Sequence, residues 1–226
     1  MRVLIACEYS GAVRDAFIAH GHDAMSCDLL PTEVPGPHYQ GDLRDILRAG
    51  WHLMIAHPPC TYLSVSGLHW NKRRPERAAQ TEQGLEFVRL LLDAPIARIA
   101  LENPISCISS RIRKPDQIIQ PWQFGHDASK ATCLWLKGLP KLILDPSKRI
   151  PGRIVGEDRR GQTIVRWSNQ TDSGQNKLSP SADRWKLRSV TYAGIADAMA
   201  DQWGKYATYC ELAGTALHHL PYRRMK

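Results

Sequence analysis

The chain has 226 residues, of which 43% are hydrophobic and 23% are charged, a composition typical of a folded globular domain with at most a small insert. Its net charge of +8 favours an anionic partner, nucleic acid ahead of a membrane surface, over a charge that serves solubility alone. Six widely spaced cysteines include no Cys-x-x-Cys pair, so we expect no metal site, free thiols and a cytoplasmic location. We expect neither a signal peptide nor a membrane-spanning segment.

The first half of the chain predicts an alternation of strands and helices. In chain order we expect a strand at 2–7, a helix at 12–20, a strand at 23–27, a short helix at 41–48, a strand at 53–56, a helix at 76–92 and a strand at 97–101. Gly21 is expected to end the first helix as its C′ residue. This order predicts an α/β fold with a doubly wound, mostly parallel, Rossmann-like sheet.

The second half is less regular. We expect a connection at 109–130, a strand at 132–136, a further strand at 141–144 and a helix at 193–212. The intervening segment is polar and rich in Pro, Gly, Ser, Arg and Lys, which indicates an insert or a set of loops. We therefore divide the chain into a main domain of residues 1–144 and 186–212, a small insert of residues 145–185 and a basic tail of residues 213–226.

Three features at strand ends are typical of a nucleotide pocket. The first strand runs into Cys7-Glu-Tyr-Ser-Gly11 and then a helix, where doubly wound folds hold a nucleotide. Asp28 ends the second strand about 20 residues further on, where an acid contacts a ribose. Asp42 follows Gly41 at the end of a third strand. Each feature alone fits a turn, a cap or a surface acid, but their order favours a cofactor site.

The stretch from Trp51 to Gly67 holds the leading nucleophile. An apolar strand ends at Pro58 and Pro59, and Cys60 follows at once, at the edge where open α/β sheets place their chemistry. The thiolate is the reactive form of cysteine, whereas a small buried hydrophobe is the plainer interpretation of a cysteine such as Cys27.

A carboxylate follows the next strand. Glu102 comes directly after the apolar residues 97–101, so it can face Cys60 across two neighbouring strand ends. Partial burial would raise its pKa and let it hold or donate a proton. A helix cap or a solvent-facing acid is the alternative interpretation.

The residues around these two side chains resemble the motifs of DNA cytosine-C5 methyltransferases. Pro-Pro-Cys60-Thr-Tyr-Leu-Ser-Val-Ser-Gly67 is similar to that family's Pro-Cys-Gln…Ser-x-Ser-Gly motif, and Glu102-Asn-Pro104 to its Glu-Asn-Val motif. The chain most resembles the small, divergent phage-type members of the family. The shared motifs are Pro-Trp-x-Phe-Gly at 121–125, Lys-x-Thr-x-Leu-Trp at 130–135 and Gly-Ile-Ala-x-Ala-Met-Ala at 194–200. The resemblance covers residues 2–144 and 186–204.

The resemblance implies S-adenosylmethionine as methyl donor and cytosine in DNA as target, flipped out of the duplex. In that scheme Cys60 attacks C6, Glu102 holds a proton at N3, Asn103 positions Glu102, and Lys130 is a base or a phosphate contact. The implied cofactor pocket comprises Cys7, Glu8, Tyr9, Ser10, Gly11, Asp28, Leu29, Asp42, Leu43 and Pro58. For a phage-encoded enzyme, the compartment would be the host cytoplasm.

Basic segments supply the expected DNA contacts. The loop at 64–77 would close on DNA as a mobile lid, although a solvated helix start is the alternative. The contacts expected there and in the insert are Ser64, Ser66, Lys72, Arg73, Arg74 and Arg166. Further candidates, by charge and aromatic content alone, are Arg153, Arg159, Arg160, Trp167 and Lys177.

Three departures from the family pattern leave other functions open. The first turn lacks two of the usual glycines, and Lys130 and Thr132 stand where the family has two arginines that support the glutamate; lysine has no planar fork to replace one. A catalytically lapsed, basic DNA-binding module is one alternative. Transfer of another one-carbon group to cytosine, or action on a free nucleotide, is the other.

Overall fold

A computed structural model describes residues 1–181 and 184–218 of the chain. A seven-stranded sheet forms its centre, in the order β3-β2-β1-β4-β5-β7-β6. The strands are β1 (Arg2–Ala6), β2 (Asp23–Asp28), β3 (His38–Gln40), β4 (Leu53–Ala56), β5 (Arg98–Pro104), β6 (Gln117–Ile119) and β7 (Thr132–Lys137). Neighbours from β3 to β5 are parallel, and β7 runs antiparallel to both β5 and β6. The fold is therefore mixed α/β with a mostly parallel sheet.

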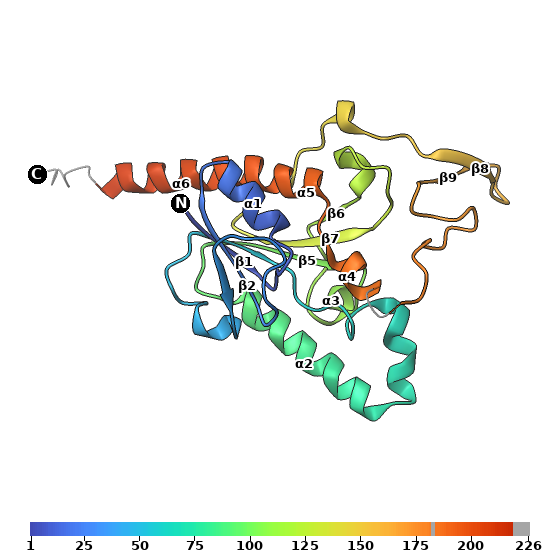
Figure 1. Ribbon diagram of the computed structural model, residues 1–226, viewed down its shortest axis with the longest axis horizontal. Helices are drawn as coiled ribbons and strands as arrows, with labels where there is room; N and C mark the ends of the chain where they lie inside the picture. The colour runs from blue at the N-terminus through green and yellow to red at the C-terminus, as the bar shows by residue number, and fades with distance from the viewer. Residues whose placement is uncertain (182–183, 219–226) are drawn as a thin grey trace, which may run out of the picture.

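Helices cover both faces of this sheet (Figure 1). Helix α2 (Pro75–Leu92) packs on one face, and α1 (Ala12–Ala19), α5 (Ala193–Ala198) and α6 (Gly204–His218) lie on the other. Successive residues of β1 alternate between the two cores: Leu4 faces α2, whereas Val3 and Ile5 face α1 and α5. Because both faces are buried, the central strands are almost wholly apolar rather than alternating.

The helix ends follow from local sequence. Gly21 has φ 81° and donates its backbone N–H to the Ile18 carbonyl, while His22 N–H reaches back to the Phe17 carbonyl. This Schellman-type pattern confirms Gly21 as the C′ residue of α1. Helix α2 begins at Pro75, where a missing N–H costs nothing.

Several predicted elements are wrong or misplaced. The expected loop at 64–77 contains the 3₁₀ helix η2 (Val65–Lys72) and the first turn of α2, and the expected connection at 109–130 contains α3 (Ile108–Arg111), β6 and η3 (Pro121–Phe124). The short helix predicted at 41–48 is reduced to η1 (Leu43–Asp45). Strand β5 continues through Glu102 to Pro104, so Glu102 lies within a strand and not after it.

The strand predicted at 141–144 does not form. The backbone of Leu142 instead exchanges two hydrogen bonds with the Gln117 side chain, and that of Ile143 exchanges two with Gln202. Side-chain amides thus satisfy this apolar segment without a partner strand.

The insert (residues 145–185) forms a separate small unit at one end of the molecule (Figure 1). It contains η4 (Pro146–Lys148) and a two-stranded antiparallel sheet of β8 (Arg153–Glu157) and β9 (Thr163–Arg166), and α4 (Arg184–Ser189) begins just before its end. The chain then continues from α5 through the π-helical turn η5 (Met199–Trp203) into α6. Of the predicted basic tail, residues 219–226 lie outside the described residues. Among the helices described, none is long and apolar enough to cross a membrane.

Candidate active site

The strand order reverses between β1 and β4, so a crevice is expected at their carboxyl ends. The sheet extends from β1 toward β3 on one side and from β4 toward β6 on the other, and ligands of open α/β sheets bind where the order reverses in this way. The His57 N–H donates to the Ala6 carbonyl at 2.9 Å, which extends the β1–β4 ladder up to this crevice. The chain leaves the sheet only at Pro58, because prolines cannot continue a ladder.

Cys60 is an exposed residue in a turn just beyond the end of β4. Its carbonyl accepts the N–H groups of Leu63 at 3.1 Å and Ser64 at 2.9 Å. Helix α2 holds the same turn from outside, since Arg77 donates to the Thr61 carbonyl and Thr81 to the Tyr62 carbonyl. The thiol is thus presented to solvent by a backbone that a strand end and a helix both restrain.

The end of β5 holds the Cys60 segment from the other side. Asn103 is 1% exposed and donates from Nδ2 to the Pro58 carbonyl at 2.9 Å. Beyond β5, the Cys107 N–H donates to the Leu63 carbonyl at 2.9 Å. The structure therefore joins Asn103 to the Pro-Pro-Cys segment, and the neighbouring residue Glu102 points to the opposite face of the sheet because strand side chains alternate.

Glu102 lies in a charged and largely buried environment. Its Oε2 is 3.2 Å from Nδ1 of His57. Burial pushes the pKa of this carboxyl group up, but the hydrogen bond with His57, the positive charge of Lys130 and the Thr132 side chain together hold the pKa below its ordinary value. The expected rise in the Glu102 pKa is therefore wrong, because its partners outweigh desolvation. Without a bound base, Glu102 is a carboxylate.

Although Cys60 is exposed as a residue, the protein around its thiol partly desolvates the sulfur and raises its pKa, and the charge of Glu102 raises the pKa further. Lys130 and Arg188 oppose this shift because positive charge favours the thiolate. The pKa effects place Cys60, Glu102 and Lys130 within electrostatic reach of one another. Their charges are also linked: a proton on Glu102 would remove the nearby negative charge and make the Cys60 thiolate easier to form.

The predicted cofactor turn is built around a carboxylate that caps α1. Glu8 is 5% exposed, and its oxygens accept the N–H groups of Val13 at 2.7 Å and Arg14 at 3.2 Å. Ser10 donates to the same carboxylate at 3.3 Å. The carboxylate occupies the helix N-terminus that binds phosphate in dinucleotide-binding folds. This arrangement disfavours a phosphate group at the turn.

The rest of the turn is strained and partly covered. Cys7 is the sole non-glycine residue with positive φ, at 59°, in the described chain, and Gly11 has φ 77°. Tyr9 is 8% exposed; its hydroxyl lies 3.0 Å from Ser189 Oγ, and its ring is 6.0 Å from that of Trp185. Helix α4 therefore lies over the first βα turn.

The two predicted acids lie beside the same turn. Burial raises the pKa of the Cys7 thiol, and the charges of Asp28 and Asp42 raise it further. Asp28 accepts the Leu30 N–H, and Asp42 caps η1 and pairs with Arg44 at 2.9 Å. Of the other residues predicted at the cofactor pocket, Leu29 is 74% exposed at the end of β2, whereas Leu43 and Pro58 are buried.

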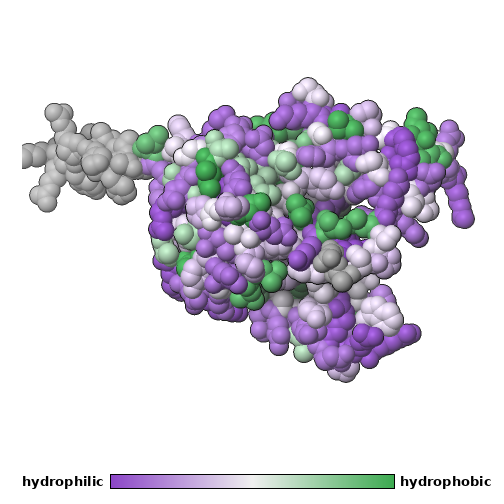
Figure 2. All heavy atoms as spheres, in the orientation of Figure 1, coloured by the Kyte–Doolittle hydropathy of each residue, from purple (hydrophilic) through white to green (hydrophobic). Residues whose placement is uncertain are grey.

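The basic segment after Cys60 is docked on α2 rather than free. Trp70 of η2 lies under the guanidinium groups of Arg73 and Arg74, at 5.9 and 5.3 Å from its ring centre. Lys72 ends η2, and the hydroxyls of Ser64 and Ser66 are 3.1 Å apart beside Cys60. Figure 2 shows hydrophilic side chains gathered over the projection that η2 and the start of α2 form at the lower end of the view.

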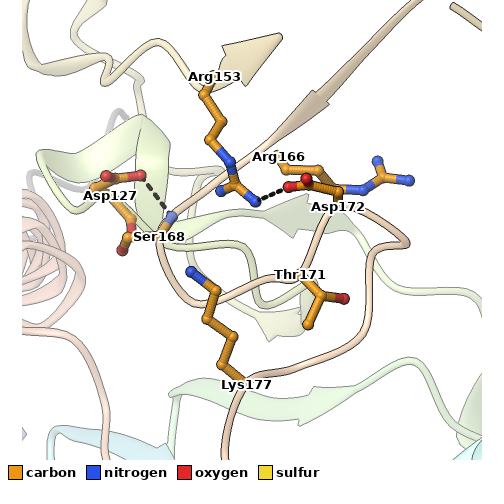
Figure 3. Close-up of a pocket in the computed structure, with 7 residues that line it drawn as sticks. All are labelled: Asp127, Arg153, Arg166, Ser168, Thr171, Asp172 and Lys177. Atoms are coloured by element: carbon orange, nitrogen blue, oxygen red, sulfur yellow. Dashed lines mark hydrogen bonds and ion pairs between the residues drawn. The ribbon is translucent and has the colours of Figure 1, made fainter. Parts of the chain in front are cut away.

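The insert encloses a hollow of about 550 Å³ with mixed charge. The residues that line it are Asp127, Arg153, Arg166, Ser168, Thr171, Asp172 and Lys177 (Figure 3). Arg153 pairs with Asp172 at 2.6 Å and also donates to the carbonyls of Trp167 and Gln170. Figure 3 shows the Lys177 side chain extending into the hollow, toward Ser168. Arg159 and Arg160 follow β8 in the turn of the hairpin and do not line the hollow.

One side chain at the centre of the site was missed by the sequence analysis. His57 contacts Glu102, yet its position directly after the apolar strand, in His-Pro-Pro-Cys60, was a usable signal. Arg14 was missed too: it is fully buried and donates to Ser26, Thr32 and the Val34 and Pro35 carbonyls, which fixes the loop after Asp28. Within the described residues, no group of three or more His, Cys, Asp or Glu side chains is placed to hold a metal ion.

Comparison with known proteins adds little to this geometry. No protein-family model matches the chain, and no curated protein matches it either. Among solved structures, one from E. coli, described as a candidate DNA modification methyltransferase encoded within a prophage, is similar over 60% of this chain and 46% of that chain, with 12% identity and a TM-score of 0.40. The chain thus spans less than half the length of that structure, and a similarity this low identifies neither the fold nor the function.

Proposed function

We propose that this chain is a doubly wound, S-adenosylmethionine-dependent methyltransferase that methylates C5 of cytosine in DNA through a covalent bond from Cys60 to C6. The observation that supports the proposal is that Glu102 and Lys130 line one small hollow and that the charges of both act on the Cys60 thiol, near the carboxyl ends of β4 and β5. Nucleophile, proton holder and cation are the groups that addition to a pyrimidine ring needs.

The residues at the neighbouring strand ends fit a nucleoside without phosphates. The Glu8 carboxylate occupies the end of α1 where a phosphate would bind, and Asp28 and Asp42 lie close to Cys7 at the end of β1. Carboxylates suit the ribose hydroxyls and the amino group of S-adenosylmethionine. When bound, S-adenosylmethionine supplies the methyl group that C5 of cytosine takes up.

The chain's own residues account for the activation of cytosine. Cys60 adds to C6 as a thiolate. Glu102 takes up a proton from water when the base binds and passes it to N3, so that the electron pair of the ring becomes available at C5. Lys130 favours the thiolate and the carboxylate through its charge. Asn103 holds the Pro58 carbonyl and with it the segment that presents Cys60. Loss of the C5 proton to a base then allows the bond between Cys60 and C6 to break.

DNA would lie across two basic regions on either side of Cys60. Residues of η2 and the start of α2, including Lys72, Arg73 and Arg74, form one region, and the insert with Arg166 and Lys177 forms the other. The net charge of +8 supports a polyanionic substrate. The target base must leave the stack for Cys60 to reach C6.

The proposal is tested by incubating the protein with duplex DNA and S-adenosylmethionine labelled in its methyl group, and then digesting the DNA to nucleosides. We expect label in 5-methyldeoxycytidine. Label in an exocyclic amino group would contradict the proposed chemistry. DNA binding without any label would instead support the lapsed binding module, and label only in free cytosine nucleotides would support action on the nucleotide.

A further inference from the structure

His57 connects the two strands that carry the proposed chemistry. Its backbone continues β4, through the hydrogen bond to Ala6, and its ring nitrogen Nδ1 lies 3.2 Å from Oε2 of Glu102. The His57 and Glu102 side chains are only 12% and 13% exposed. A hydrogen bond between two residues 45 positions apart, each on a central strand end, has a geometry fixed by the sheet rather than by flexible side chains.

The other ring nitrogen of His57 is buried and has no protein partner within the described residues. Two other histidines use a ring nitrogen to accept a backbone hydrogen bond: His52 accepts the Arg2 N–H, and His126 accepts the Gly194 N–H. Among the described residues, Glu102 is therefore the one protein partner of the His57 ring. A buried polar atom without a hydrogen-bond partner costs folding free energy, so the placement of this ring calls for an explanation.

The groups around this pair show what His57 contributes. Lys130 supplies charge from the segment before β7, Thr132 approaches Glu102 from β7, and the charge of Glu102 acts on the Cys60 thiol. Lys130 Nζ is already directed to the Val190 carbonyl at 3.4 Å, and Thr132 donates its hydroxyl to the Lys130 carbonyl at 3.2 Å. Because a carboxylate can only accept a hydrogen bond, His57 Nδ1 is the donor to Glu102.

We propose that His57 is a positioning residue for Glu102, an inference that rests on the proposed function. Its Nδ1–H holds Oε2 and fixes the plane of the carboxyl group, which leaves Oε1 to face N3 of the target cytosine. When Glu102 gives its proton to N3, the same hydrogen bond stabilises the carboxylate that remains. The proton moves from Glu102 Oε1 to N3, and His57 keeps its own.

Single-turnover methyl transfer to DNA tests this role with three variants. His57→Asn keeps a donor near the position of Nδ1, His57→Gln moves the donor toward the position of Nε2, and His57→Ala removes both. We expect the rate of transfer to fall about 10- to 100-fold in His57→Ala and His57→Gln, the range for losing a hydrogen bond to a charged group, and to recover to within about fivefold of wild type in His57→Asn. His52→Asn, at the other end of β4, is the matched control and should keep the wild-type rate.

A positioning role also predicts which constants stay fixed. The dissociation constants for S-adenosylmethionine and for DNA should match the wild type in all folded variants, so the loss falls on kcat and not on KM. Equal rates in wild type and His57→Gln would overturn the inference, as would a His57→Asn variant no faster than His57→Gln. If His57→Ala fails to fold, the order of the Asn and Gln variants still decides. A wild type without transfer activity would instead refute the proposed function itself.

Discussion

The carboxyl ends of the central strands β4 and β5, called the edge below, and the insert are held in place by different kinds of contact. At the edge, Cys60 and Glu102 follow strand segments that are fully buried, Leu53–Ala56 and residues 99–101, and Asn103 bonds the two segments together. No described residue of the insert belongs to the hydrophobic core. The insert is instead attached by the stacked rings of Trp122 and Trp167, 5.2 Å apart, and by paired hydrogen bonds between Asn169 and Ser129.

Under the proposed function, this difference implies that the strand ends perform the chemistry and that the insert contacts DNA. Chemistry needs atoms held to within about half an ångström, which rigid strands provide, whereas contact with a charged polymer tolerates adjustable side chains on exposed loops. Substitutions at the edge should therefore change rates, and substitutions in the insert should change affinity.

The largest effect is expected from Cys60→Ser. Removing the nucleophile should lower kcat more than about 10⁴-fold, while the free energy of unfolding changes by less than about 0.5 kcal/mol because the side chain is exposed. Steady-state kinetics and urea denaturation measure the two quantities. Cys210→Ser, on α6, is the matched control; an equal loss of activity in that variant would show that the effect is not specific to Cys60.

Glu102→Gln should slow methyl transfer about 10²- to 10⁴-fold, as expected for loss of a proton donor. It should also speed the alkylation of Cys60 by iodoacetamide near neutral pH. The sign follows from the charges: Glu102 raises the Cys60 pKa, so its neutralisation lowers that pKa and increases the thiolate fraction. Lys130→Met should slow alkylation, because Lys130 lowers the Cys60 pKa. The same direction of change in both variants would rule out the charge arrangement described for the edge.

In the insert, Arg166→Ala and Lys177→Ala should each weaken DNA binding about three- to tenfold at moderate salt. Loss of one phosphate contact should also reduce the slope of log K against log salt concentration by about one, with kcat at saturating DNA unchanged. Fluorescence anisotropy over a salt series measures this. Arg89→Ala, an exposed position on α2, is the control, and an equal loss of affinity there would remove any special role for the insert.

The smallest effect concerns the strained turn at Cys7. Positive φ costs a non-glycine residue about 1–2 kcal/mol, but glycine also gains more freedom in the unfolded chain. These terms oppose each other, so Cys7→Gly should leave the free energy of unfolding within about 1 kcal/mol of wild type. Cys7→Val should lower it more than Cys7→Gly does, because a β-branched residue is least compatible with φ 59°. Chemical denaturation of both variants would reveal the reverse order if the strain were absent.

Much of the sheet could be predicted because its strands are short apolar runs ended by Pro or Asp, as at Pro58 and Asp28. Residues 141–144 misled the prediction because two distant glutamines, Gln117 and Gln202, satisfy their backbone. The insert's hairpin was equally hidden, since its strands are mostly exposed and lack an apolar face.

For the site, neighbouring strand ends predict that Cys60 and Glu102 lie near each other, and the charge of Glu102 does act on the Cys60 thiol. The direction in which the Glu102 pKa shifts could not be predicted, because the shift depends on His57, 45 residues away in the chain. Asn103 also took a different partner from the expected one, since its side chain lies on the other face of β5 from Glu102 and bonds Pro58. Such contacts follow from strand register and side-chain direction, which composition and spacing do not specify.

The most direct measurement of the central claim uses duplex DNA that contains 5-fluorocytosine, together with S-adenosylmethionine. Fluorine at C5 cannot be removed as a proton, so a covalent adduct that forms at C6 cannot resolve. We predict a DNA–protein species that survives denaturing electrophoresis and whose peptide map places the bond at Cys60, and no such species in Cys60→Ser. A folded wild-type protein that binds this DNA and cofactor yet forms no adduct would contradict the account.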